Sequence, residues 1–257
     1  MKRSSVKIIL GVLTLFLTSL PQTMAADDLG IVPAKSRAFG KGLTRWSETY
    51  WRWFSAGANP AQSQVNGVQM LPVPSFENMG GEGTWQDPRR LRGTLEINLA
   101  PGTPFALGTY SWIREAYYDG YVDPYLDDVA VLDVVHPILK IDGKTVLSDK
   151  NKAKYYVPTT EFDPTVLYDE PTEYGAIEAV SFQGIVVLGM PLSPGVHTIH
   201  LHQSIFIPYE KDEGFYSLFG PDGYGVIYDL TWIVTVPKPT KRSHHDVSRD
   251  FKRTFDK

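Results

Sequence analysis

The sequence has no cysteine among its 257 residues. The chain therefore forms no disulfide and offers neither a thiolate metal ligand nor a cysteine nucleophile. It also lacks three motifs of enzyme chemistry: the G-x-S-x-G nucleophile elbow, the H-E-x-x-H zinc motif and the G-x-x-x-x-G-K-[ST] phosphate loop. A glycosidase needs only two well-placed carboxylates, so that class of enzyme stays open.

Basic residues are scarce in the central part of the chain. Residues 26–237 carry 15 Lys and Arg against 26 Asp and Glu, which gives a formal net charge of −11. Such a charge repels phosphate and argues against nucleic acid as a partner. Residues 238–257 form instead a basic tail with hardly any apolar side chains. We expect this tail to be flexible.

The one long apolar run of the sequence, residues 8–20, lies at the N-terminus. Basic residues precede it, and Thr23 and Ala25 place small side chains at the two positions that a signal peptidase recognises. We therefore expect residues 1–25 to be a signal peptide. The mature protein is then exported, periplasmic or extracellular, and does not span the membrane. A retained anchor is the weaker alternative, because the run is short for a membrane span.

Aromatic residues at three- and four-residue steps predict one helix, at residues 44–54, which Thr44 can cap. The stripe consists of Leu43, Trp46, Tyr50, Trp53 and Phe54. Such a stripe could grip a sugar or a cofactor. Packing of the helix against a sheet explains it more simply, because large aromatic side chains dominate core burial.

Elsewhere apolar and polar residues alternate with period two, which indicates strands with one buried face. The alternation is clearest in three segments, residues 94–99, 196–207 and 226–236. A nearly continuous apolar run predicts a further strand at residues 128–135, and Asp142-Gly143 predicts a hairpin turn. The sequence thus predicts an all-β domain over residues 26–237, an antiparallel β-sandwich or jelly roll with one N-terminal amphipathic helix.

Two histidines, His200 and His202, lie on the same polar face of the predicted strand 196–207. This arrangement occurs in the metal sites of jelly-roll enzymes, but a catalytic metal also needs a third ligand and an open position. No third ligand follows at the expected spacing. We therefore expect two solvent-exposed histidines without a metal or other cofactor, and keep a metal-dependent enzyme as the alternative.

The segment 115–128 packs four tyrosines and five carboxylates into fourteen positions between two predicted strands. A tyrosine ring stacks on sugars, and its hydroxyl forms hydrogen bonds at little cost in side-chain entropy. Carboxylates accept hydrogen bonds from sugar hydroxyls. The segment could equally cap the sandwich. The candidate ligand-binding residues are Tyr117, Tyr118, Asp119, Tyr121, Asp123 and Tyr125. A second stretch of acidic and aromatic residues, 161–174, has a similar composition.

Several segments resemble, in order, a group of uncharacterised exported bacterial proteins. Residues 43–53, with Trp46, Tyr50, Trp51 and Trp53, are similar to the W-x-x-x-W-W-x-W segment that opens the mature part of those proteins. The further similar segments are residues 102–104, 141–143, 191–199 (PLSPGVHTI) and 228–236 (YDLTWIVTV). The resemblance implies export and a β fold and names no ligand. Members of the group usually carry cysteines, which this chain lacks.

Two hypotheses of different class follow. The first is an exported, non-catalytic β-sandwich protein that binds a glycan or another cell-envelope component through its tyrosine- and acid-rich loops. The second is a jelly-roll hydrolase or metal-dependent enzyme that uses His200 and His202. A third ligand beside the histidines favours the enzyme, and exposed tyrosines held on one edge favour the binding protein.

Overall fold

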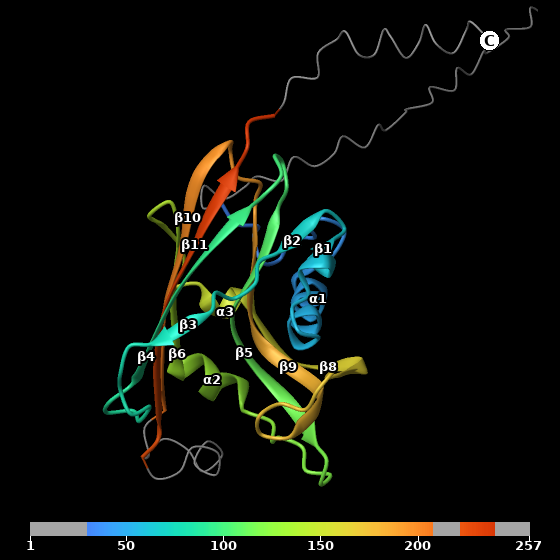
Figure 1. Ribbon diagram of the computed structural model, residues 1–257, viewed down its shortest axis with the longest axis vertical. Coiled ribbons are helices and arrows are strands. Elements are labelled where there is room, and N and C mark those ends of the chain that lie inside the picture. Colours follow the sequence, from blue (N-terminus) through green and yellow to red (C-terminus); the bar gives the residue numbers. More distant parts are fainter. Residues whose placement is uncertain (1–29, 208–221, 240–257) are drawn as a thin grey trace, which may run out of the picture.

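The computed structural model describes residues 30–207 and 222–239 (Figure 1). The predicted signal peptide and nearly all of the predicted basic tail lie outside these ranges. None of the helices within them combines the length and the hydropathy that a bilayer crossing requires.

Strands dominate the described chain, and they form two sheets. The five-stranded sheet has the order β1 (Gln64–Val65), β2 (Val68–Met70), β5 (Phe105–Tyr117), β9 (Ala176–Gly189) and β8 (Tyr156–Leu167). The six-stranded sheet has the order β3 (Phe76–Asn78), β4 (Arg89–Asn98), β11 (Tyr224–Val236), β10 (Gly195–Ile207), β6 (Val135–Ile141) and β7 (Lys144–Leu147). The predicted β-sandwich is therefore confirmed.

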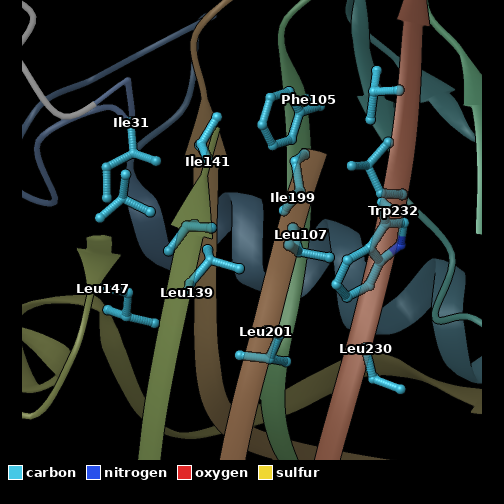
Figure 2. Close-up of a cluster of buried hydrophobic side chains, with 14 of the residues drawn as sticks. Ile31, Phe105, Leu107, Leu139, Ile141, Leu147, Ile199, Leu201, Leu230 and Trp232 are labelled. Carbon is cyan, nitrogen blue, oxygen red and sulfur yellow. The ribbon is translucent and has the colours of Figure 1, made fainter. Parts of the chain in front are cut away.

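The main core fills the space between the two sheets (Figure 2). Leu107 of β5, Leu201 of β10 and Trp232 of β11 are among the buried side chains that meet there. The indole nitrogen of Trp232 donates a hydrogen bond to the carbonyl of Pro72 at 2.7 Å, so its polar atom is satisfied inside the core. The even-numbered apolar residues of β11 point inward, as the alternation of residues 226–236 predicts.

Helix α1 (Leu43–Ser55) covers the outer face of the five-stranded sheet, where it packs on β5, β8 and β9 (Figure 1). Its aromatic residues form a second buried cluster, and Trp46 and Tyr50 are completely buried. Gly108 of β5 permits this close approach, because a Cβ atom there would lie 2.4 Å from the Tyr50 ring. The aromatic stripe is thus a packing surface. The helix begins at Leu43 with Gly42 as N-cap, so the cap expected at Thr44 is wrong.

The strand predicted at residues 128–135 is wrong, because Asp128–Val134 form a short helix, α2. One carboxylate oxygen of Asp127 accepts hydrogen bonds from the backbone N–H groups of Val129 and Ala130, at 3.0 and 2.9 Å, which caps the helix. Val131 and Val134, three residues apart, are then buried together. The preference of valine for strands yields here to the cap and to tertiary packing. One further short helix, α3 (Lys152–Tyr155), precedes β8.

Two strand pairs are parallel, whereas the sequence predicts antiparallel sheets. β11 pairs with β4 in parallel over the full length of β4, and β2 pairs with β5 in parallel over two residues. Both sheets are therefore mixed. Alternation specifies which face of a strand is buried and leaves the direction of its neighbour open. The local hairpin is as predicted: Asp142 and Gly143 both have positive φ, +48° and +79°, and join β6 to β7.

Candidate functional site: the tyrosine loop and its arginine

The tyrosine-rich segment starts at the end of β5 and runs to α2; we call residues 117–127 the tyrosine loop. The chain reverses at Gly120, which has a φ of +84°. The turn is closed by the N–H of Gly120, which donates to the carbonyl of Tyr117 at 3.0 Å, and by the N–H of Tyr117, which donates to the carbonyl of Tyr121 at 2.9 Å. Asp119 accepts from the N–H of Tyr121 at 2.9 Å. The loop is thus ordered by its own hydrogen bonds.

Asp123 braces the loop against β5. Its side chain is only 9% exposed, and its two carboxylate oxygens accept hydrogen bonds from the N–H of Glu115 at 3.0 Å and from the hydroxyl of Tyr117 at 3.4 Å. Burial raises the pKa of Asp123, and the two hydrogen bonds oppose that rise. Because both oxygens are engaged inside the protein, Asp123 positions the loop more readily than it meets a ligand.

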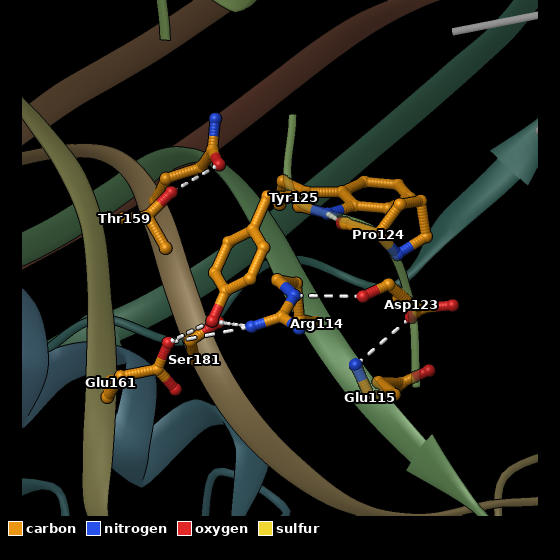
Figure 3. Close-up of polar contacts among 10 residues, drawn as sticks. Arg114, Glu115, Asp123, Pro124, Tyr125, Thr159, Glu161 and Ser181 are labelled. Carbon is orange, nitrogen blue, oxygen red and sulfur yellow. Dashed lines mark hydrogen bonds and ion pairs between the residues drawn. The ribbon is translucent and has the colours of Figure 1, made fainter. Parts of the chain in front are cut away.

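Arg114 lies at the centre of the polar contacts beneath the loop (Figure 3). This β5 side chain is 8% exposed and donates to the carbonyl of Asp123 at 2.9 Å and to the hydroxyl of Ser181 at 3.2 Å. The guanidinium also lies 3.5 Å from a carboxylate oxygen of Glu161 on β8. A buried charge needs this number of partners to offset its desolvation. Arg114 thereby joins the loop to β8 and β9.

The ring of Tyr125 is held in one orientation by two contacts. The guanidinium of Arg114 stacks on one face, 3.4 Å from the ring centroid. The Tyr125 hydroxyl donates to Glu161 at 2.7 Å. The residue is nevertheless 61% exposed, so the ring face opposite Arg114 is open to solvent.

Two more tyrosines project from the same loop. Tyr118 is 76% exposed and Tyr121 is 51% exposed. The ring of Tyr121 rests against that of Tyr117, with centroids 5.5 Å apart. The hydroxyl of Tyr117 faces Asp123, and burial together with the nearby carboxylates raises its pKa to about 12. The loop therefore presents Tyr118, Tyr121 and Tyr125 outward, while Tyr117 packs against Tyr121.

Two residues of the second acidic and aromatic stretch, Glu161 and Tyr168, contact the loop and the end of β5. Glu161 contacts Tyr125 and Arg114, and the hydroxyl of Tyr168 donates to Glu115 at 2.5 Å. Burial raises the pKa of Glu115, and the bond from Tyr168 opposes the rise. The sequence shows the shared composition of the two stretches but not their contact. It gives no role to Arg114 or Ser181; for Arg114 the only signal is a charged residue near the end of an apolar strand.

The histidine pair lies elsewhere, on the outer face of the six-stranded sheet. Nε2 of His200 lies 2.7 Å from a carboxylate oxygen of Asp229, and the guanidinium of Arg92 lies 3.9 Å from the other. His202 is exposed. Within residues 30–207 and 222–239, no three His, Asp or Glu side chains are grouped closely enough to hold a metal ion.

Comparison with known proteins assigns the chain to no family. No protein-family model matches the chain, and no curated protein is similar to it. Among solved structures, the chain shows a weak likeness to CfaE, the adhesive subunit of the CFA/I fimbria of enterotoxigenic Escherichia coli, with 9% identity and a TM-score of 0.20. The match covers 56% of this chain and 46% of that one. A likeness at this level carries no argument about fold or function.

Proposed function

We propose that this chain is an exported, non-catalytic binding protein whose tyrosine loop binds a glycan of the cell envelope. The observation that carries the proposal is the fixed, outward-facing ring of Tyr125, held by Arg114 and Glu161 beside the exposed Tyr118 and Tyr121. A cluster of exposed aromatic rings on an ordered loop is typical of a binding surface.

A glycan suits this surface for two physical reasons. Sugar rings present C–H faces that stack on aromatic rings, and their hydroxyls form hydrogen bonds with tyrosine hydroxyls and with the carboxylate of the exposed Asp119. The loop is also ordered before binding, because backbone bonds and the Arg114 contacts fix it. Little conformational entropy is then lost when the ligand binds.

A glycan array with the purified protein, followed by calorimetry on the best ligand, tests the proposal. Replacing Tyr118 and Tyr121 together by alanine should abolish binding while the melting temperature stays within about 2 °C, because both side chains are exposed. The matched control is Tyr174→Ala, which removes a tyrosine that is 78% exposed outside the loop, and this variant should bind as the parent does.

The histidines provide a second control. Replacing His200 and His202 together by glutamine should leave glycan binding unchanged, because both lie on the other sheet. Full glycan binding by the Tyr118/Tyr121 double variant would refute the proposal. Loss of binding on removal of the histidines, together with a stoichiometric bound metal, would favour the metal-dependent enzyme.

A further inference from the structure

A cleft of about 400 Å³ opens between the two sheets, and Leu126 of the tyrosine loop belongs to its lining. We call it the intersheet cleft. Residues of β5, β10 and β11 form its walls, with Trp51 and Phe54 of α1 at one side. It reaches the surface at Phe76 of β3, whose side chain is half exposed. Its volume falls in the range of small-molecule sites, about 300–1,000 Å³.

The lining of the intersheet cleft is aromatic and uncharged. Three tryptophans and three tyrosines contribute: Trp51, Trp112, Trp232, Tyr110, Tyr224 and Tyr228. No Asp, Glu, Lys, Arg or His belongs to the described lining. Burial raises the pKa of Tyr110 and Tyr228 well above the usual value, so both stay neutral at physiological pH. A charged ligand would lose its hydration here without gaining a counter-ion.

Three buried polar atoms in this lining lack a hydrogen-bond partner within the described ranges: Oε1 of Gln203, Oγ1 of Thr109 and Nε1 of Trp51. Gln203 is only 2% exposed and belongs to β10, among apolar side chains. Thr109 is the extra residue of a β-bulge in β5, where the pairing with β9 shifts between Gly108 and Tyr110. Buried polar atoms are normally satisfied, so three unpartnered atoms in one lining point to a hydrogen-bonding molecule that the described chain does not supply.

We propose that the intersheet cleft binds a neutral, largely apolar small molecule that carries a hydroxyl or amide donor. The donor pairs with Oε1 of Gln203, and the apolar body of the molecule packs against the tryptophans and tyrosines. The lining contains none of the exposed tyrosines of the loop, so neither proposal depends on the other. A cleft that merely held water would show no preference for an apolar body.

Three aromatic probes of nearly equal size test the proposal in calorimetric titrations of the purified full chain: 2-naphthol, naphthalene and 2-naphthoate. We expect saturable binding of one 2-naphthol per chain, with a change in tryptophan fluorescence because three tryptophans line the cleft. Naphthalene should bind about fivefold more weakly, since it cannot donate to Gln203. 2-Naphthoate should bind more weakly still.

Two variants test whether the unpartnered oxygens of Gln203 and Thr109 contribute to binding. Gln203→Leu keeps the volume of the side chain but removes Oε1, so it should abolish the preference for 2-naphthol over naphthalene. Thr109→Val removes the second unpartnered oxygen and keeps the shape of the side chain, so it should weaken the same preference even where Gln203→Leu fails to fold. Thr231→Ala, on the outer face of β11, is the control and should leave binding unchanged. Absence of saturable 2-naphthol binding, equal binding of 2-naphthoate, or a preference that survives both variants would overturn the proposal.

Discussion

Strand β5 contributes to both the tyrosine loop's support and the intersheet cleft, and these two regions differ in whether their buried polar groups have hydrogen-bond partners. Near its C-terminal end, Arg114 of β5 and Asp123 of the tyrosine loop are almost fully buried, and each has several partners. In its middle, Thr109 faces the intersheet cleft, where its hydroxyl has no partner in the described chain. The buried polar groups beneath the tyrosine loop therefore have hydrogen-bond partners within the protein, and the loop is held rigidly. In the cleft, by contrast, buried polar atoms remain without a partner in the described chain.

The largest effect is expected in the wall of the cleft. Trp232→Ala removes a completely buried ring and its bond to Pro72, and it should lower the free energy of unfolding by about 3–5 kcal/mol. Thr231→Ala, on the opposite face of β11, should change it by less than about 0.5 kcal/mol. Urea unfolding of both variants gives the comparison. Equal losses would mean that β11 is buried on both faces.

The second-largest loss of stability is expected when the side chain that supports the tyrosine loop, Arg114, is removed. Arg114→Leu leaves the Asp123 carbonyl and the Ser181 hydroxyl without their donor, and it should cost about 3 kcal/mol. Arg92→Leu is the matched control, because its guanidinium is largely exposed and lies 3.9 Å from Asp229. That change should cost less than about 0.5 kcal/mol. Similar small losses in chemical denaturation would show that the loop does not depend on Arg114.

Two buried glutamines, one with hydrogen-bond partners and one whose Oε1 lacks a partner, allow a direct comparison of the two situations. Gln183 on β9 accepts from the hydroxyl of Thr159 and donates to that of Tyr156, both at 2.8 Å, whereas Oε1 of Gln203 has no partner in the described chain. Gln183→Leu should therefore lower the free energy of unfolding by about 1–3 kcal/mol. Gln203→Leu should leave it unchanged within about 0.5 kcal/mol or raise it. The reverse order in thermal or urea unfolding would contradict the assignment of the cleft.

The smallest effect is a dependence of stability on pH from Glu115, on β5 beneath the tyrosine loop, which the uncharged lining of the intersheet cleft does not share. Burial raises the pKa of Glu115, so the folded state holds its proton at a pH where the unfolded state has lost it. The stability due to protonated Glu115 is complete below the unfolded pKa and is lost as pH rises through the folded pKa.

Urea unfolding at pH 4 and pH 7 measures this effect. The parent should lose stability relative to Glu115→Gln as the pH rises. Gln203→Leu removes no titrating group, so its difference from the parent should be the same at both values. A parent that gains stability relative to Glu115→Gln with rising pH would show that the pKa of Glu115 is lowered.

Much of the fold follows from local sequence. Period-two alternation locates β4, β10 and β11 and assigns their buried faces, because a strand side chain can point only to one face or the other. Asp142 and Gly143 specify a hairpin turn, and the aromatic stripe of α1 specifies a helix with one buried side. Composition also singles out the segment that carries the exposed tyrosines, but it leaves open whether that segment binds a ligand or caps the sandwich.

What the sequence leaves open depends on contacts between distant segments. The parallel pairing of β4 with β11 and the meeting of Arg114 with Glu161 join residues far apart in the chain, for which no local period exists. The cap by Asp127 and the burial of Val131 turn an apolar run into α2. The intersheet cleft exists only where the two sheets and α1 meet, so the unpartnered oxygen of Gln203 is invisible until the tertiary structure places it. Sequence alone determined which faces are buried, and tertiary packing decided which buried polar groups find a partner.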